Sequence, residues 1–278
     1  AGIPFNPASI GLVKSSDAYV SKSNYLAGIS HNVLAYGRKI TPGDYISFHL
    51  FYLDSGPMNE TTVQESDGTG QTFRVLDIAS SFTYARRMTD RLHLGITFKY
   101  IMEQIKFSKA QSVAIDIGSI FNTGLWGMVL GMSVTNFGPE VRYHGEDLEF
   151  PGDEEHEDNW QKVTLKWPIP LTFRMGLKTD IIGKDSFYKQ DDVHRLTLAM
   201  DGVDAIDNLT MGSIGAEYAW QEMVYFRTGY HLGHDTAGGA LGAGINLNIQ
   251  GIKLILDYAF VDYDILDYTH QFGLNFKF

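Results

Sequence analysis

The sequence predicts an all-β protein, a transmembrane antiparallel up-and-down β-barrel of about 14 strands. Three observations predict this fold. Apolar and polar residues alternate in many stretches, the connections between these stretches are alternately short and long, and the last ten residues, 269–278, alternate and end on an aromatic side chain. Alternation with period two gives a strand one apolar and one polar face. Terminal strands of soluble proteins normally fade into polar residues, so an ending on Phe278 is typical of a barrel.

Composition narrows the class of protein. The chain has 278 residues, with 29 Gly, 15 Tyr, 17 Phe and no Cys. The high content of Gly, Tyr and Phe favours one large β domain over two α/β domains. The absence of Cys excludes disulfides, thiolate metal sites and a cysteine nucleophile. A net charge of −11 disfavours a nucleic-acid partner, because phosphate backbones would be repelled. No apolar run of about 18 residues is present, so no membrane-spanning helix is expected.

The strands follow a loop-like N-terminal segment, 1–16. The stretch 92–102 is the clearest of them, because Ile96 and Phe98 alternate with Thr97 and the spacing of an amphipathic helix is absent. The expected strands in chain order are 17–22, 27–39, 46–52, 76–84, 92–102, 113–121, 128–134, 171–177, 196–200, 214–218, 226–230, 241–249, 254–260 and 269–278.

The connections alternate in length. Tight turns are expected at 40–43, 88–91, 123–124, 221–222 and 250–251, and longer loops at 55–72, 137–170, 201–210, 232–239 and 262–268. Two connections depart from this rule: 183–192 is long on the turn side, and 108–111 is short on the loop side. Outer-membrane barrels have short periplasmic turns and longer external loops. The chain is therefore expected in a bacterial outer membrane, with residues 17–278 as the barrel and both termini periplasmic.

The apolar faces are expected to meet lipid and the opposite faces a polar lumen. Both signs of charge occur on the inner faces, so ion pairs across the interior are expected, since unpaired buried charges are costly. A structural lattice and a substrate path are both open for these residues. The candidate lattice residues are Asp77, Asp116, Arg174, Arg195, Glu217, Arg227 and Asp257. Fourteen strands enclose more than side chains readily fill, and the N-terminal segment is the candidate plug.

Several runs resemble the PorV/PorQ family of outer-membrane barrels, which are similar to the FadL fatty-acid transporters. These runs are Phe-Asn-Pro-Ala at 5–8, Phe-Thr-Tyr-Ala-Arg-Arg-Met-Thr-Asp-Arg at 82–91, Gly-Met-Ser-Val-Thr-Asn-Phe-Gly at 131–138 and His-Arg-Leu-Thr-Leu-Ala at 194–199. The resemblance implies a FadL-like barrel whose hatch motif is Asn6, Pro7 and Ala8. The Gly-rich segment that the family carries before this motif is lacking, so a truncated hatch is expected. The resemblance also implies an association with type IX secretion.

Other candidate sites are few. The loop 146–158 is acidic, and carboxylate oxygens are Ca²⁺ ligands. Asp153, Glu154 and Glu155 are therefore candidate ligands, although the spacing is not that of an EF-hand and a solvated loop is the competing interpretation. Neither Gly-x-Ser-x-Gly nor His-Glu-x-x-His is present, so no enzyme and no other cofactor are expected. Phe276 and Phe278 form the expected assembly signal.

Two functions stay open. The first is a binding or scaffold role, in which the rim engages secreted cargo or a partner outer-membrane complex. The second is FadL-like transport of hydrophobic small molecules. Transport requires an apolar pocket or a lateral opening, and the inward faces are polar, so the sequence favours the first. The expected partners are outer-membrane lipid, lipopolysaccharide, the barrel-assembly machinery and a secreted cargo or translocon protein.

Overall fold

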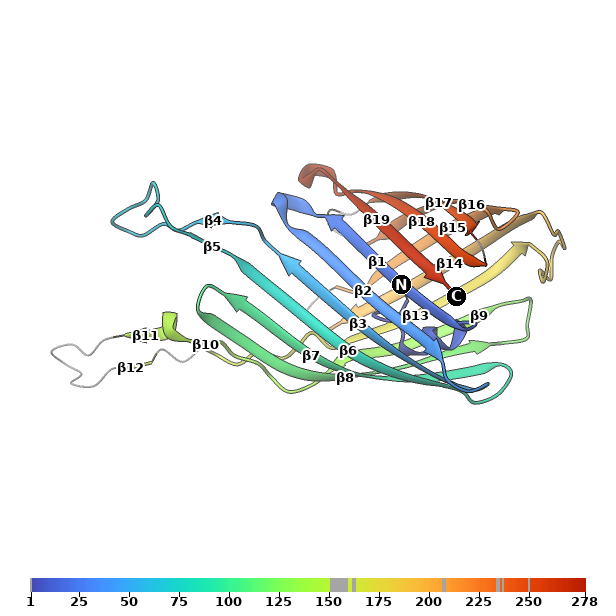
Figure 1. Ribbon diagram of the computed structural model, residues 1–278, viewed down its shortest axis with the longest axis horizontal. Helices are drawn as coiled ribbons and strands as arrows, with labels where there is room; N and C mark the ends of the chain where they lie inside the picture. The colour runs from blue at the N-terminus through green and yellow to red at the C-terminus, as the bar shows by residue number, and fades with distance from the viewer. Residues whose placement is uncertain are drawn as a thin grey trace.

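The computed structural model describes residues 2–150, 160–161, 164–206, 209–233, 236, 238–249 and 251–278. Within these residues, fourteen long strands form one closed antiparallel barrel (Figure 1). They are β1 (Ser16–Asn24), β2 (Ser30–Lys39), β3 (Asp44–Asp54), β6 (Val75–Arg87), β7 (Leu92–Ile105), β8 (Ser108–Asn122), β9 (Val129–Phe137), β13 (Thr172–Ile182), β14 (His194–Ala205), β15 (Met211–Trp220), β16 (Val224–Leu232), β17 (Gly239–Ile249), β18 (Ile252–Asp262) and β19 (Tyr268–Lys277).

Each strand pairs with its neighbours in the chain, and the last pairs with the first. In this closing pair, Asp17 of β1 lies opposite Lys277 of β19. The predicted fold class is confirmed, and each of the fourteen expected strands is present. The first strand, expected at 17–22, is nine residues long, because it pairs along its whole length with β2 on one side and along most of it with β19 on the other.

Three predicted boundaries are wrong. The loop expected at 201–210 starts only after Ala205, because β14 continues through 201–205 and pairs there with β13. The second strand begins at Ser30, because a 3₁₀ turn, η2 (Leu26–Gly28), occupies the expected start and holds Ala27 at φ 54°. Residues 108–111 are not a loop. They belong to β8, and the β7–β8 connection is the two-residue turn 106–107, in which Lys106 has φ 53°. Such left-handed backbone permits a tight hairpin turn.

The two ends of the barrel differ. One end of the barrel, the turn end, carries the connections 40–43 and 88–91, the start of β1 and the end of β19. The opposite end is the loop end. From the loop end project the small hairpin β4 (Met58–Asn59) with β5 (Thr72–Phe73), and the segment that holds β10 (His144–Gly145), η3 (Glu146–Leu148), β11 (Glu149–Phe150) and β12 (Trp160–Gln161) (Figure 1). The connection 183–193 is long at the turn end, as expected.

The outer wall is an apolar belt. Large apolar side chains stand exposed at alternate positions along neighbouring strands, and they include Leu34, Phe48, Phe82, Phe98, Val113, Ile117, Met175, Met200, Ile214, Phe226, Leu241, Ile245, Leu256 and Phe272. A continuous apolar surface of this extent is the wall that lipid covers. In the terminal strand Phe272 is exposed and Thr269 is buried, in keeping with the predicted lipid face. No helix in the described part of the chain is long and apolar enough to cross a membrane.

The N-terminal segment folds inside the barrel. Its 3₁₀ helix η1 (Pro7–Leu12) packs against the inner faces of β2, β3, β6, β7 and β8. Ile3 and Ile10 form an apolar core there with Ala35, Tyr45 and Ala85 of the wall. We call residues 2–13 the hatch segment.

Candidate functional site in the barrel lumen

The hatch segment is tied to the wall through Asn6. The Asn6 amide donates hydrogen bonds to the backbone carbonyls of Ser119, at 2.9 Å, and Met132, at 3.2 Å, and its oxygen accepts one from the Ala8 backbone N–H at 3.0 Å. The third bond caps η1, and Pro7 suits the first helical position because it has no N–H to satisfy. Asn6, Pro7 and Ala8 thus lie together inside the wall; that they act as a hatch motif stays a prediction.

Glycines of the wall make room for this segment. A Cβ atom at Gly95 of β7 would lie 2.5 Å from the carbonyl carbon of Pro7, and one at Gly118 of β8 would collide with Asn6. At Gly37 of β2 it would collide with Ile10. The inner wall is therefore shaped to the backbone of the hatch segment, and the absence of side chains at these glycines is what permits the close approach.

Arg174 and Ser133 complete the seat. The Ser133 hydroxyl donates to the Phe5 carbonyl at 2.7 Å, and the Arg174 guanidinium lies 5.4 Å from the centre of the Phe5 ring. This is cation–π geometry. The sequence placed Arg174 in an ion-pair lattice. Among the described residues it forms no close ion pair; its guanidinium packs on the Phe5 ring, and the Asp201 carboxylate is near enough to attract its charge.

Four of the predicted lattice residues form one chain of ion pairs across β14, β15, β16 and β18. Arg195 donates to Glu217 at 2.8 Å, Arg227 donates to the other oxygen of Glu217 at 2.6 Å, and Arg227 also reaches Asp257 at 2.7 Å. Arg195 extends the chain to Glu222 at 2.6 Å. Because each charge has a partner, the cost of placing these groups inside the wall is largely offset.

Asp116 stabilises an irregularity in the wall. It is 1% exposed and pairs with Lys99 at 2.9 Å. The β8–β9 register shifts between Ile115 and Ile117, and there the Asp116 carboxylate accepts a hydrogen bond from the Asn136 backbone N–H at 2.8 Å. The side chain thus replaces a ladder partner that the bulge removes. Asn136 has φ 64°, and β9 ends one residue later.

Asp77, the last of the predicted lattice residues, has no cation within ion-pair distance in the described part of the chain. It lies opposite Glu103 of β7, and Glu103 accepts a hydrogen bond from the Tyr143 hydroxyl at 3.1 Å. Burial, reinforced by the negative charge of Glu103, raises the pKa of Tyr143 to about 12. No described residue forms an ion pair with Asp77, so this part of the inner wall is acidic.

Aromatic side chains gather on the inner face at the loop end. Tyr25 stacks on His31 with ring centres 4.7 Å apart, and Phe51 meets His31 edge-on at 5.5 Å. Tyr263 meets Tyr25 edge-on at 5.7 Å, and burial together with its hydrogen bond to Tyr25 raises the pKa of Tyr263 to about 12. We call these four residues the mouth cluster. The sequence alone does not predict this cluster. Alternation along β2 and β3 places His31 and Phe51 on the inner face, but it does not bring Tyr25 and Tyr263 to them.

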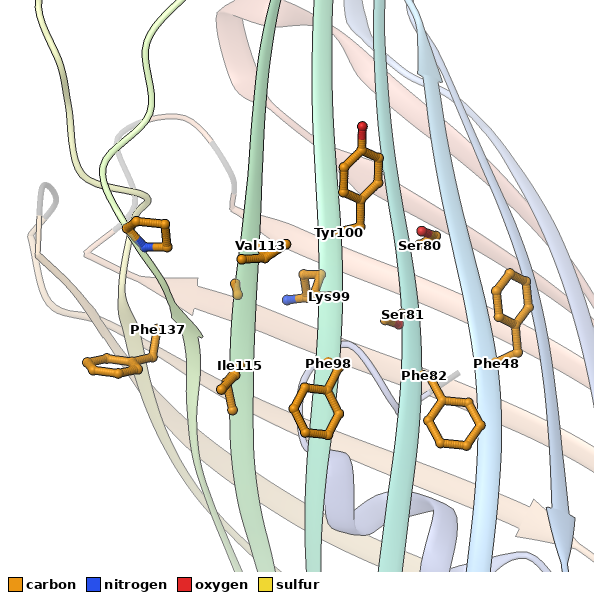
Figure 2. A pocket seen from close by; sticks show the side chains of 12 residues that line it. Phe48, Ser80, Ser81, Phe82, Phe98, Lys99, Tyr100, Val113, Ile115 and Phe137 are labelled. Carbon is orange, nitrogen blue, oxygen red and sulfur yellow. The ribbon is translucent and has the colours of Figure 1, made fainter.

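A shallow groove of about 530 Å³ lies on the outer wall over β3, β6, β7 and β8. Phe48, Phe82 and Phe98 stand in a row across three neighbouring strands (Figure 2). Beside them Ser80 occupies an outward position where its neighbours carry large side chains. The groove is thus a dent in the apolar belt, on the opposite face from the lumen.

The remaining predicted residues are placed as follows. Phe276 and Phe278 end the closing strand region, and Phe278 is 56% exposed; their role in assembly stays a prediction. Asp153, Glu154 and Glu155 lie outside the described residues. Within the described part of the chain, no group of three His, Cys, Asp or Glu side chains is arranged to hold a metal ion.

The closed 14-strand wall is the fold of FadL-like outer-membrane barrels. The chain is similar to the Pseudomonas putida toluene transporter TodX, with a TM-score of 0.57 and 8% identity over 99% of this chain and 91% of TodX. The Ralstonia pickettii toluene transporter TbuX has a TM-score of 0.59 and 12% identity, over 99% of this chain and 92% of TbuX. A Pseudomonas aeruginosa FadL homologue has a TM-score of 0.53 and 12% identity, over 98% of this chain and 92% of the homologue. No protein-family model and no curated protein sequence matches the chain.

Proposed function

We propose that this barrel carries hydrophobic small molecules across a bacterial outer membrane, with its turn end on the periplasmic side. The observation that carries the proposal is the mouth cluster. Tyr25, His31, Phe51 and Tyr263 place aromatic surface on the inner face at the entrance, and such surface favours apolar ligands.

The polar lumen does not oppose this function. The sequence favoured a scaffold role because the inward faces carry charges, but Arg195, Glu217, Arg227 and Asp257 satisfy one another. Paired charges of this kind serve as structure, and the aromatic entrance lies at the other end of the wall. Proteins of the same fold include two toluene transporters and the monoaromatic hydrocarbon channel CymD; this similarity supports the proposal by analogy of fold.

Uptake of labelled toluene tests the proposal. Cells that express the barrel should take up the probe faster than cells that lack it, and Phe51→Ala combined with Tyr25→Ala should lower uptake severalfold. Phe48→Ala is the matched control, because Phe48 lies on the same strand as Phe51 but faces outward. Equal uptake with and without the barrel, or equal loss in the control variant, would count against transport.

The scaffold role implied by the PorV/PorQ resemblance is the second candidate. One observation favours it: the loop end extends beyond the wall through the β4–β5 hairpin and the segment that holds β10 to β12, and such extensions offer surface to a partner. Purification from native membranes discriminates the two. A secreted protein or a translocon that copurifies with the barrel would favour the scaffold role, and a bound apolar molecule would favour transport.

A further inference from the structure

A cationic groove lies on the outer face of the wall, next to the apolar belt on the side of the loop end. Toward the loop end the outward side chains change from apolar to polar, at Gln111 on β8 and one outward pair later, at Gln104, on β7. Tyr100 lies opposite Val113, whereas Gln104, near the loop end, lies opposite Lys109. Lipid that covers the belt therefore ends where the Lys109 ammonium begins, which is the level of the headgroups.

The loop after β9 supplies the second side of this groove. β10 pairs with the free edge of β8, so that His144 lies opposite Lys109. Tyr143 bonds inward to Glu103; its neighbours Arg142 and His144 therefore face outward, and the Arg142 Nε donates to His144 Nε2 at 3.1 Å. The groove has a volume of about 860 Å³, and its charged or titratable lining residues are Lys106, Lys109, Glu140, Arg142, His144, Glu146 and Lys166.

The charges in this groove are unequal. Four cations line it against two carboxylates, and Lys106 is already paired with Glu60 at 2.8 Å. None of Lys109, Arg142 and Lys166 forms an ion pair with a carboxylate in the described part of the chain. Lys and Arg side chains arranged in this way bind phosphate oxygens, with Arg offering two parallel donors.

We propose that this groove binds the phosphate groups of a lipopolysaccharide molecule whose acyl chains lie on the belt below it. Two features favour this occupant: the groove is continuous with the lipid-covered surface, and its charge complements a phosphorylated headgroup. The inference rests on the proposed outer-membrane location with the loop end outside, but it does not depend on what the lumen transports.

Binding of lipopolysaccharide to the purified barrel in detergent tests the inference. The triple variant Lys109→Gln, Arg142→Gln and Lys166→Gln should bind about a hundredfold more weakly, since a basic residue near a charged lipid surface contributes about 1 kcal/mol. The same lipopolysaccharide stripped of its phosphates should bind as weakly to the natural chain. The charge-conserving triple variant Lys109→Arg, Arg142→Lys and Lys166→Arg should retain binding.

A matched control removes three exposed cations elsewhere on the wall: Lys22→Gln, Arg38→Gln and Arg86→Gln. Its affinity should equal that of the natural chain. Should the first triple variant fail to fold, Lys109→Gln alone should weaken binding about fivefold. Unchanged affinity of the groove variants, an equal loss in the control, or equal binding of the dephosphorylated lipid overturns the inference. Toluene uptake, measured separately, shows whether the transport proposal stands or fails independently.

Discussion

A single methyl group at Gly95 should unseat the hatch segment. The Cβ atom of Gly95→Ala would lie 2.5 Å from the Pro7 carbonyl carbon and 2.6 Å from the Ala8 backbone nitrogen. Ordinary contact begins at 3.4 Å, so the hatch backbone must move by about 0.9 Å to relieve an overpacked contact. Overpacking of this kind costs about 1–3 kcal/mol, which raises the population of the unseated state roughly 5- to 150-fold.

The chain contains no cysteine, so one introduced thiol can report this movement. Ser9→Cys is suitable because the Ser9 hydroxyl is buried and has no hydrogen-bond partner in the described part of the chain. In the Ser9→Cys background, the rate of maleimide labelling should rise with Gly95→Ala by the same roughly 5- to 150-fold factor, since labelling follows local opening.

Gly229→Ala is the control for this experiment. Gly229 also lies in a strand and faces inward, but a Cβ there would meet only the Ile214 carbonyl oxygen at 3.4 Å. Its labelling rate should match that of Ser9→Cys alone. If Gly95→Ala labels no faster than this control, the hatch segment does not lie against Gly95 on the inner wall.

Three further predictions concern the wall and its two ends. Glu217→Gln should lower the free energy of unfolding by about 2 kcal/mol, because Glu217 accepts charged hydrogen bonds from two arginines. Chemical denaturation measures this free energy. Glu222→Gln, at the more exposed end of the row of ion pairs, should lower it by less than about 1 kcal/mol. Spectrophotometric titration should find two tyrosines that ionise near pH 12, and Tyr143→Phe and Tyr263→Phe should each remove one of them. The raised pKa values of these two tyrosines favour the neutral form. The stability that they contribute is therefore present below pH 10 and is lost as the pH rises through about 12. Deletion of Phe278 should lower the amount of barrel in the membrane more than Phe187→Ala does in the exposed turn-end loop, and equal amounts of the two variants on an immunoblot would contradict the assembly role.

The strands were predictable because each one carries its own signal. In 92–102 alternation is a local property of the sequence, and a strand between two partners keeps it whatever the rest of the chain does. The connection between β7 and β8 was misplaced for the opposite reason. Ser108 is a residue type common in turns, but the turn depends on the left-handed backbone of Lys106, which composition does not reveal.

Of the site, the sequence predicted only which side chains lie on the inner face of a strand. Alternation correctly put Arg174 and Glu217 on the inner face, yet it could not say that Glu217 joins two arginines while Arg174 packs on Phe5. Those pairings depend on the register between strands and on the position of the hatch segment. The same holds for Gly95, because nothing near it in the sequence indicates that Pro7, 88 positions earlier, must pass close to it.

The seam between β1 and β19 has a consequence for the order of assembly. The hatch segment directly precedes β1, and it lies inside a wall that closes only when β19 reaches β1. The pairing of β1 with β19 joins residues that lie far apart in the sequence, and such contacts are the slow kind in folding. In an order of assembly in which β19 joins β1 last, the hatch segment is seated on β6, β7 and β8 while the wall is still an open sheet.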